Sequence, residues 1–363
     1  MKPQSSWPLR LKAGELVEVR RLDEIVSTLT PQGDLFGLPF MPEMVKYCGR
    51  RMRVFKRLHK TCDLQYGQGG LSAEGIVHLR DARCDGAAHG GCQASCTLLW
   101  REEWLRRAAA SQSPVADPDP PADESTALPI QWTLQPDVAS GARPRYRCQV
   151  TEQARYTRPL KFWDLRQYVN DVRSRNVSVG DLAAASVRSL YRNLIDLGIG
   201  YRVLVKLYNS IQRRRGGLEH PYVLGELSKT PERPLDLRPG DRVRIRPFRE
   251  IMQTLDGNNK NRGLWFVPQE MGEHCNGQAV VATRVERILS EKTGEMLDLK
   301  SPCVILDGIY CRGLAIPGRV LCPRASALFW REIWLERDGS DSGLTVPQAP
   351  PASTPPLTDR TDS

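Results

Sequence analysis

The residues best suited to chemistry are cysteines, of which this chain of 363 residues has ten. Three of them share one short run with a histidine: Cys84, His89, Cys92 and Cys96 all lie in RCDGAAHGGCQASC, residues 83–96. Clustered thiolates are stable when a cation neutralises them, and the glycines of the run suit a loop that bends tightly around an ion. The pattern therefore predicts a site for a zinc ion or an iron–sulfur cluster.

The chain also matches itself, at offsets of 226 to 230 residues. The segment GELVEVR at 14–20 meets GDRVRIR at 240–246, and WREEWL at 100–105 meets WREIWL at 330–335. Identities that recur in one order over such a length indicate an internal duplication. The sequence therefore predicts two copies of one domain.

The same comparison extends the predicted metal site to both copies, because it pairs Cys48 with Cys275, Cys84 with Cys311 and Cys92 with Cys322. Cys303 would supply a fourth donor in the second copy, whereas Cys62, His89 and Cys96 remain alternatives in the first. If only the three shared thiols bind the ion, its fourth coordination position stays open, as a catalytic metal requires. The competing interpretation is that these thiols are small buried hydrophobes. The predicted metal ligands are Cys48, Cys84, His89, Cys92, Cys96, Cys275, Cys303, Cys311 and Cys322.

The elements that must position these residues are mostly short strands. Each copy opens with apolar and charged residues in alternation, which is typical of a half-buried strand. The predicted fold class is mainly β with a helical connector, built as two tandem SH3-like small barrel repeats. Further strands are expected at 51–55, 76–80, 280–285 and 303–307, short helices at 22–29 and 248–255, and a turn at 291–294. The tryptophans of the two WRE motifs are expected to fill cores.

Composition divides the chain into five predicted parts. These are a first Cys-rich repeat at 8–107, a disordered linker at 108–130, a mainly helical basic connector at 131–234, a second repeat at 235–337 and a disordered tail at 338–363. Residues 161–216 hold eleven Lys and Arg against four Asp, which is +7 of the net charge of +10. The connector is therefore expected to meet a protein partner or an anionic surface, either nucleic acid or membrane.

The motifs LPFMPEM at 38–44, RCDGAAHGGCQASC at 83–96 and the two WREXWL segments resemble an uncharacterised bacterial family of two-repeat cysteine-rich proteins. The resemblance covers most of the chain and implies a bacterial, intracellular context close to polysaccharide or natural-product biosynthesis, with no established activity. The string CDGAAH is also similar to the motif of the CDGSH iron–sulfur proteins, but its spacing from Cys to His is one residue longer.

The composition and the absence of known motifs exclude several classes of protein. The chain is 40% hydrophobic and 26% charged, has no apolar run that would span a bilayer and no secretory leader, so a cytoplasmic location is expected. Phosphate-binding and hydrolase signatures are absent from the sequence. The leading hypothesis is a metal-binding interaction or assembly protein, accessory to a bacterial biosynthetic pathway. The alternatives are an enzyme centred on the CDGAAHGGC loop and, third, a nucleic-acid-binding protein.

Overall fold

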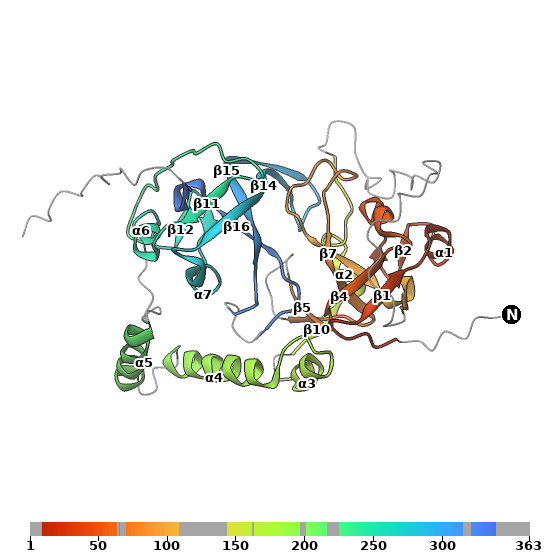
Figure 1. The fold of residues 1–363 in the computed structure, drawn as a ribbon, viewed down its shortest axis with the longest axis horizontal. Helices are drawn as coiled ribbons and strands as arrows, with labels where there is room; N and C mark the ends of the chain where they lie inside the picture. The colour runs from red at the N-terminus through yellow and green to blue at the C-terminus, as the bar shows by residue number, and fades with distance from the viewer. Residues whose placement is uncertain are drawn as a thin grey trace, which may run out of the picture.

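The computed structural model describes residues 9–63, 65, 70–108, 144–161, 163–196, 201–215, 225–314 and 321–338. Apart from Ala108 and Asp338, the predicted linker and tail lie outside these residues. The structure is mainly β, as predicted, and contains two five-stranded sheets, one from each end of the chain (Figure 1).

The N-terminal sheet has the strand order β8-β7-β4-β1-β9, and every neighbouring pair is antiparallel. Strand β1 alternates half-buried and buried residues, which places Val17 and Val19 in the core. The short helix α1 (Leu22–Val26) follows β1, as the sequence predicts. The strands are β1 (Leu16–Val19), β4 (Arg51–Arg57), β7 (Ile76–Arg83), β8 (Thr97–Arg101) and β9 (Leu105–Arg107).

The C-terminal sheet has the corresponding order β16-β15-β14-β11-β17, so the sequence match is accompanied by a match of strand order. Helix α6 (Phe248–Met252) follows its first strand, and the predicted turn at 291–294 joins β14 to β15. The strands are β11 (Arg242–Ile245), β14 (Gln278–Leu289), β15 (Met296–Tyr310), β16 (Ala327–Trp330) and β17 (Leu335–Arg337).

The β-structure curls into a half-barrel, but the edge strands β8 and β9, like β16 and β17, do not pair with each other among the described strands. Closed SH3-like barrels therefore stay a prediction.

Smaller elements surround the sheets: β2 (Asp34–Leu35), β3 (Leu38–Pro39), β5 (Lys60–Cys62), β6 (Gly70–Ser72), β10 (Arg158–Leu160), β12 (Lys260–Asn261), β13 (Leu264–Trp265), α2 (Gln153–Tyr156), α7 (Pro268–Met271) and the 3-10 helices η1 (Pro42–Tyr47), η2 (Glu102–Trp104), η5 (Gly272–His274) and η6 (Glu332–Trp334).

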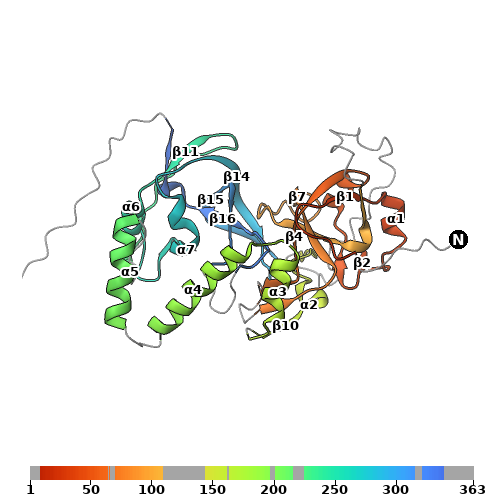
Figure 2. The same ribbon diagram turned by 60° about the horizontal axis from the view of Figure 1, so that its bottom comes forward.

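Three helices occupy the segment predicted to be helical: α3 (Arg166–Arg173), α4 (Val179–Asp196) and α5 (Tyr201–Arg215). Figures 1 and 2 show them, in green, passing from the side of the N-terminal sheet to the side of the C-terminal sheet. In the part of the chain that the structure describes, no helix has the length and apolar character to cross a membrane.

The tryptophans of both WRE motifs are buried, which confirms their predicted role in the cores. In the N-terminal half Phe40 meets the Trp104 ring edge to face, with centroids 5.3 Å apart, and in the C-terminal half Phe266 meets Trp334 at the same distance. The two halves also interlock, because Leu289 of β14 is a member of the N-terminal core.

Candidate metal centre

The loop between β7 and β8 carries the predicted donors, and its backbone is held in a tight fold. The Cys84 amide donates to the Cys96 carbonyl at 2.9 Å and closes the neck of the loop. Inside it, the Gly86 carbonyl accepts hydrogen bonds from the amides of His89 (3.1 Å) and Gly91 (2.9 Å). Gly86 has a φ of +72°, and a Cβ there would lie 2.0 Å from the Cys92 carbonyl oxygen. Glycine at position 86 is what allows Cys84 and Cys92 to share the loop.

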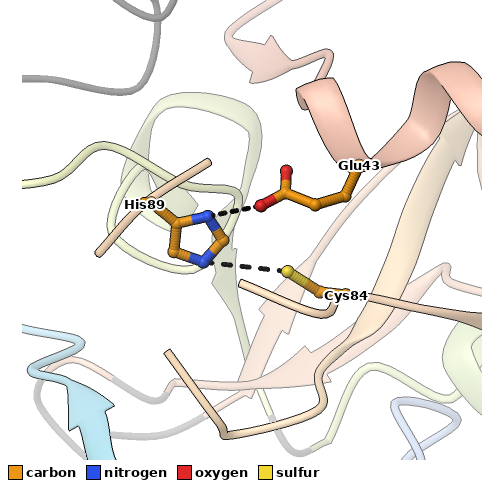
Figure 3. A group of neighbouring side chains, drawn as sticks. All are labelled: Glu43, Cys84 and His89. Atoms are coloured by element: carbon orange, nitrogen blue, oxygen red, sulfur yellow. Dashed lines mark hydrogen bonds and ion pairs between the residues drawn. The ribbon is translucent and has the colours of Figure 1, made fainter. Parts of the chain in front are cut away.

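Three buried or half-buried donors meet inside this loop: Glu43, Cys84 and His89 (Figure 3). The Nδ1 atom of His89 lies 2.9 Å from Glu43 Oε1, and its Nε2 atom lies 3.7 Å from Cys84 Sγ. The three donor atoms are all within 4.8 Å of one another, a spacing that no other group of three such donors reaches in the described residues. This group could hold a metal ion.

Glu43 is itself held firmly in place. It belongs to η1, and its Oε1 also accepts the amide of Ala88, at 3.1 Å, from the loop. Beside it, Lys46 of the same turn forms a 2.7 Å ion pair with Asp85. Turn η1 and the cysteine loop are therefore joined by two separate polar contacts, which fix the imidazole between them.

The electrostatics of the site are those of several acidic groups around one imidazole. Burial alone would lower the pKa of His89, but contacts with Cys84, Cys92 and Glu43 raise it well above its ordinary value. Burial raises the pKa of Cys84, and contact with His89 opposes this shift. At Cys92 burial also acts to raise the pKa, but the His89 contact and backbone amides lower it overall. The shifts favour the anionic form of Cys92 but the protonated form of Cys84, and a bound cation would stabilise the thiolate form of both.

The C-terminal half covers this loop. The amide of Leu289 donates to Cys92 Sγ at 3.3 Å, and the amide of Gln93 donates to the Arg287 carbonyl at 3.1 Å. Gly90 lies against Met296 and Tyr146, where a Cβ would come within 2.8 Å of both side chains. A cavity of about 40 Å³ remains beside Cys84, His89 and Cys92, enough for a water molecule or two.

The other predicted ligands lie in different places. Cys96 and the cysteine at 148 line the same small cavity as Cys84. Cys48 packs against the N-terminal core, Cys275 directs its thiol to the Met271 carbonyl, and Cys303 is buried against Val285. The structure does not bring Cys48, Cys275 or Cys303 to the Glu43, Cys84 and His89 group.

Glu43 is the site residue that sequence reasoning missed. A signal for it exists in the self-comparison, since Glu43 falls opposite Glu270 and both acids are buried. Two carboxylates buried at matched positions predict a shared polar role. The sequence matches no protein-family model and no curated protein, so the site has to be judged on its geometry.

Proposed function

We propose that this chain is a zinc-binding protein and that Cys84, His89 and Cys92 hold the ion. The observation that carries the proposal is the distance of 3.7 Å between His89 Nε2 and Cys84 Sγ. A sulfur and a nitrogen bound to one tetrahedral zinc ion, at their usual bond lengths, are about 3.6 Å apart. The two atoms therefore already have the separation that a shared ion requires.

The contacts of the histidine support this assignment of roles. Because Glu43 contacts Nδ1, the Nε2 atom is the one left to face Cys84 and an ion. A carboxylate on the far nitrogen of a ligating histidine orients the ring and makes it a stronger donor. Burial acts to raise the pKa of Cys92, but the nearby His89 ring and backbone amides lower it overall, and the Cys92 sulfur accepts the Leu289 amide at 3.3 Å.

The enclosure of the site favours a structural ion over a catalytic one. The adjoining cavity of about 40 Å³ has room for water but not for an organic substrate or for the several atoms of an iron–sulfur cluster. An ion at this position would join the cysteine loop to η1 and to the β14–β15 hairpin. We therefore infer an interaction or assembly protein stabilised by zinc, in preference to an enzyme centred on this loop.

Elemental analysis of the purified chain tests the proposal. We expect His89→Ala and Cys84→Ser each to lower the bound zinc by one equivalent, because each removes a ligand. Glu43→Gln keeps the shape of the side chain, and we expect it to weaken zinc binding about 10- to 100-fold. Cys275→Ser, which removes a thiol remote from the site, serves as the control and should leave the zinc content unchanged. A His89→Ala chain with undiminished zinc would contradict the assignment.

A second candidate function rests on a separate feature, which we call the basic groove. This groove has a volume of about 1380 Å³ and lies between α3, β10 and the N-terminal sheet. Trp163 at its wall is 61% exposed, with the Lys161 ammonium 5.5 Å from its ring centre. Seven basic side chains against two acidic ones line it: Arg10, Lys12, Arg57, Arg158, Lys161, Arg166 and Arg173, with Glu74 and Asp164.

Positive charge beside an exposed indole favours single-stranded nucleic acid, because phosphates bind the charges and a base stacks on the ring. We expect a fluorescent 20-nucleotide single strand to bind more weakly as salt rises from 50 to 200 mM. Trp163→Ala should lower the affinity about 10-fold or more by removing one stacking contact. Arg249→Ala, an exposed arginine outside the groove, is the control. Equal affinity in Trp163→Ala and the control would exclude the groove as the binding site.

A further inference from the structure

The helical connector exposes a large share of the chain's big apolar side chains. Thirteen such side chains are exposed in the part of the chain that the structure describes, and nine of them lie between residues 163 and 211. Single exposed apolar residues are scattered over most protein surfaces, whereas a concentration of them marks a surface that binds something. The connector helices therefore form a candidate interaction surface.

Helix α5 carries one exposed apolar row, which we call the α5 stripe. Its members, Val203, Leu207 and Ile211, are four residues apart, so they follow one another along a single face of the helix. Their exposed fractions are 72%, 59% and 41%. Because these side chains lie in water, burying them against an apolar partner is favourable.

Helix α4 carries a similar row, the α4 stripe, which consists of Val179, Val187 and Leu190. Helical periodicity places the three on one face, and they are 68%, 67% and 59% exposed. Ala185 lies on the opposite face and is only 3% exposed, so α4 is covered on that side and open on the side of the stripe. Figure 1 shows both helices along the lower edge of the molecule, outside the two sheets.

Positive charge accompanies the α5 stripe. Lys206 stands three positions after Val203, which makes the two side chains neighbours on the helix surface. Arg214 stands in the same relation to Ile211. Long basic side chains can lay their stems along apolar surface while their charges stay in water. The helix contains no acidic residue and five basic ones: Arg202, Lys206, Arg213, Arg214 and Arg215.

We propose that the connector docks on an anionic lipid bilayer through α5, with the α4 stripe adding apolar area. Negatively charged headgroups would bind the basic side chains, and the α5 stripe would enter the boundary between headgroups and acyl chains. Because basic residues stand near both ends of α5 and the stripe runs between them, the helix would lie along the surface of the bilayer.

The combination of charge and aliphatic side chains favours lipid over nucleic acid. The phosphate backbone of a nucleic acid would use the positive charges of α5 but leave the α5 stripe in water. A bilayer offers an anionic surface and an apolar interior at the same place. None of the described residues that line the basic groove belongs to α5, so the two surfaces can be altered separately.

Sedimentation of the full chain with lipid vesicles tests the proposal. We expect binding to vesicles of phosphatidylcholine and phosphatidylglycerol, and much weaker binding to phosphatidylcholine alone, because the basic side chains need an anionic surface. The double variant Leu207→Gln, Ile211→Gln should lower the partition coefficient about 10-fold or more, since two apolar side chains no longer enter the bilayer. Glutamine keeps the helix propensity high. The control pair Val280→Gln, Leu297→Gln changes side chains of β14 and β15 that are 41% and 43% exposed, and it should bind like the native chain.

A second pair of variants tests the electrostatic part. Arg213→Gln with Arg214→Gln should lower binding to the anionic vesicles about 10-fold or more, because each basic residue near the surface contributes. The control, Arg242→Gln with Arg249→Gln, removes the same charge at exposed positions outside the connector and should have a much smaller effect. Equal losses in the two pairs would contradict the proposal, because net charge alone would then explain the binding.

Unchanged vesicle binding in Leu207→Gln, Ile211→Gln would overturn the proposal. So would a native mass of two chains that this variant reduces to one, because a second copy would then cover the α5 stripe. A lower urea midpoint for the same variant without lipid would show that the stripe already packs within the chain, which also contradicts the proposal. An equal loss of affinity for single-stranded DNA would assign the stripe to nucleic acid instead.

Discussion

Gly86→Ala is expected to abolish the metal centre. The added methyl carbon would lie 2.0 Å from the Cys92 carbonyl oxygen, far inside van der Waals contact, so the backbone of the loop must move. Cys92 moves with it and leaves the position beside His89. We expect the zinc affinity to fall about 100-fold or more. This is at least as large as the loss caused by mutating a residue that orients a metal ligand. Competition with a chromophoric chelator measures this loss.

Gly91→Ala is the matched control for that variant. Gly91 lies in the same loop and has a φ of +73°, close to the +72° of Gly86, but a Cβ at Gly91 has no atom within 4 Å. Both variants bear the backbone cost of a left-handed alanine, about 1 to 2 kcal/mol. The difference between them isolates the contact with Cys92. Equal zinc affinities in the two variants would show that this contact does not shape the site.

Trp334→Ala is expected to destabilise the C-terminal half by about 3 to 5 kcal/mol, the usual result of truncating a buried aromatic side chain. The Trp334 side chain is fully buried, its ring meets Phe266 at 5.3 Å, and its Nε1 donates to Thr254 Oγ1 at 3.0 Å. The variant loses the packing and leaves a cavity. A lower urea midpoint of unfolding, followed by far-ultraviolet circular dichroism, is the measurement.

Trp265→Ala provides the comparison, because this tryptophan of β13 is 54% exposed. We expect it to change the free energy of unfolding by no more than about 0.5 kcal/mol. If the two variants unfold at the same urea concentration, the core assignment of the second WRE motif is wrong.

Several elements could be predicted from the sequence because their cause is local. Alternation around Val17 and Val243 predicted β1 and β11, and the glycines at 86, 90 and 91 predicted a tight loop. The duplication of the WRE motifs predicted buried tryptophans at equivalent places in both halves. Each of these inferences depends on residues close together in the chain, or on a direct comparison of one half with the other.

The composition of the candidate metal centre depended on residues that are distant in the sequence. Glu43 lies 46 positions before His89, and Leu289 lies 197 positions after Cys92. Sequence comparison placed Cys48 and Cys275 among the shared ligands, but matched positions do not imply that two side chains face the same point. The sequence makes Cys62 an alternative donor for the first copy, whereas the structure places it near Cys322 of the second.

The strand that opens each half, the buried tryptophans and the loop that carries Cys84, His89 and Cys92 follow from local patterns, because hydrophobic periodicity and glycine act over a few residues. Which donors meet depends on the folded chain as a whole, because the β14–β15 hairpin crosses to the N-terminal half. Side chains hundreds of positions apart become neighbours there through packing that no local pattern encodes. The cysteines thus group according to how the two halves interlock.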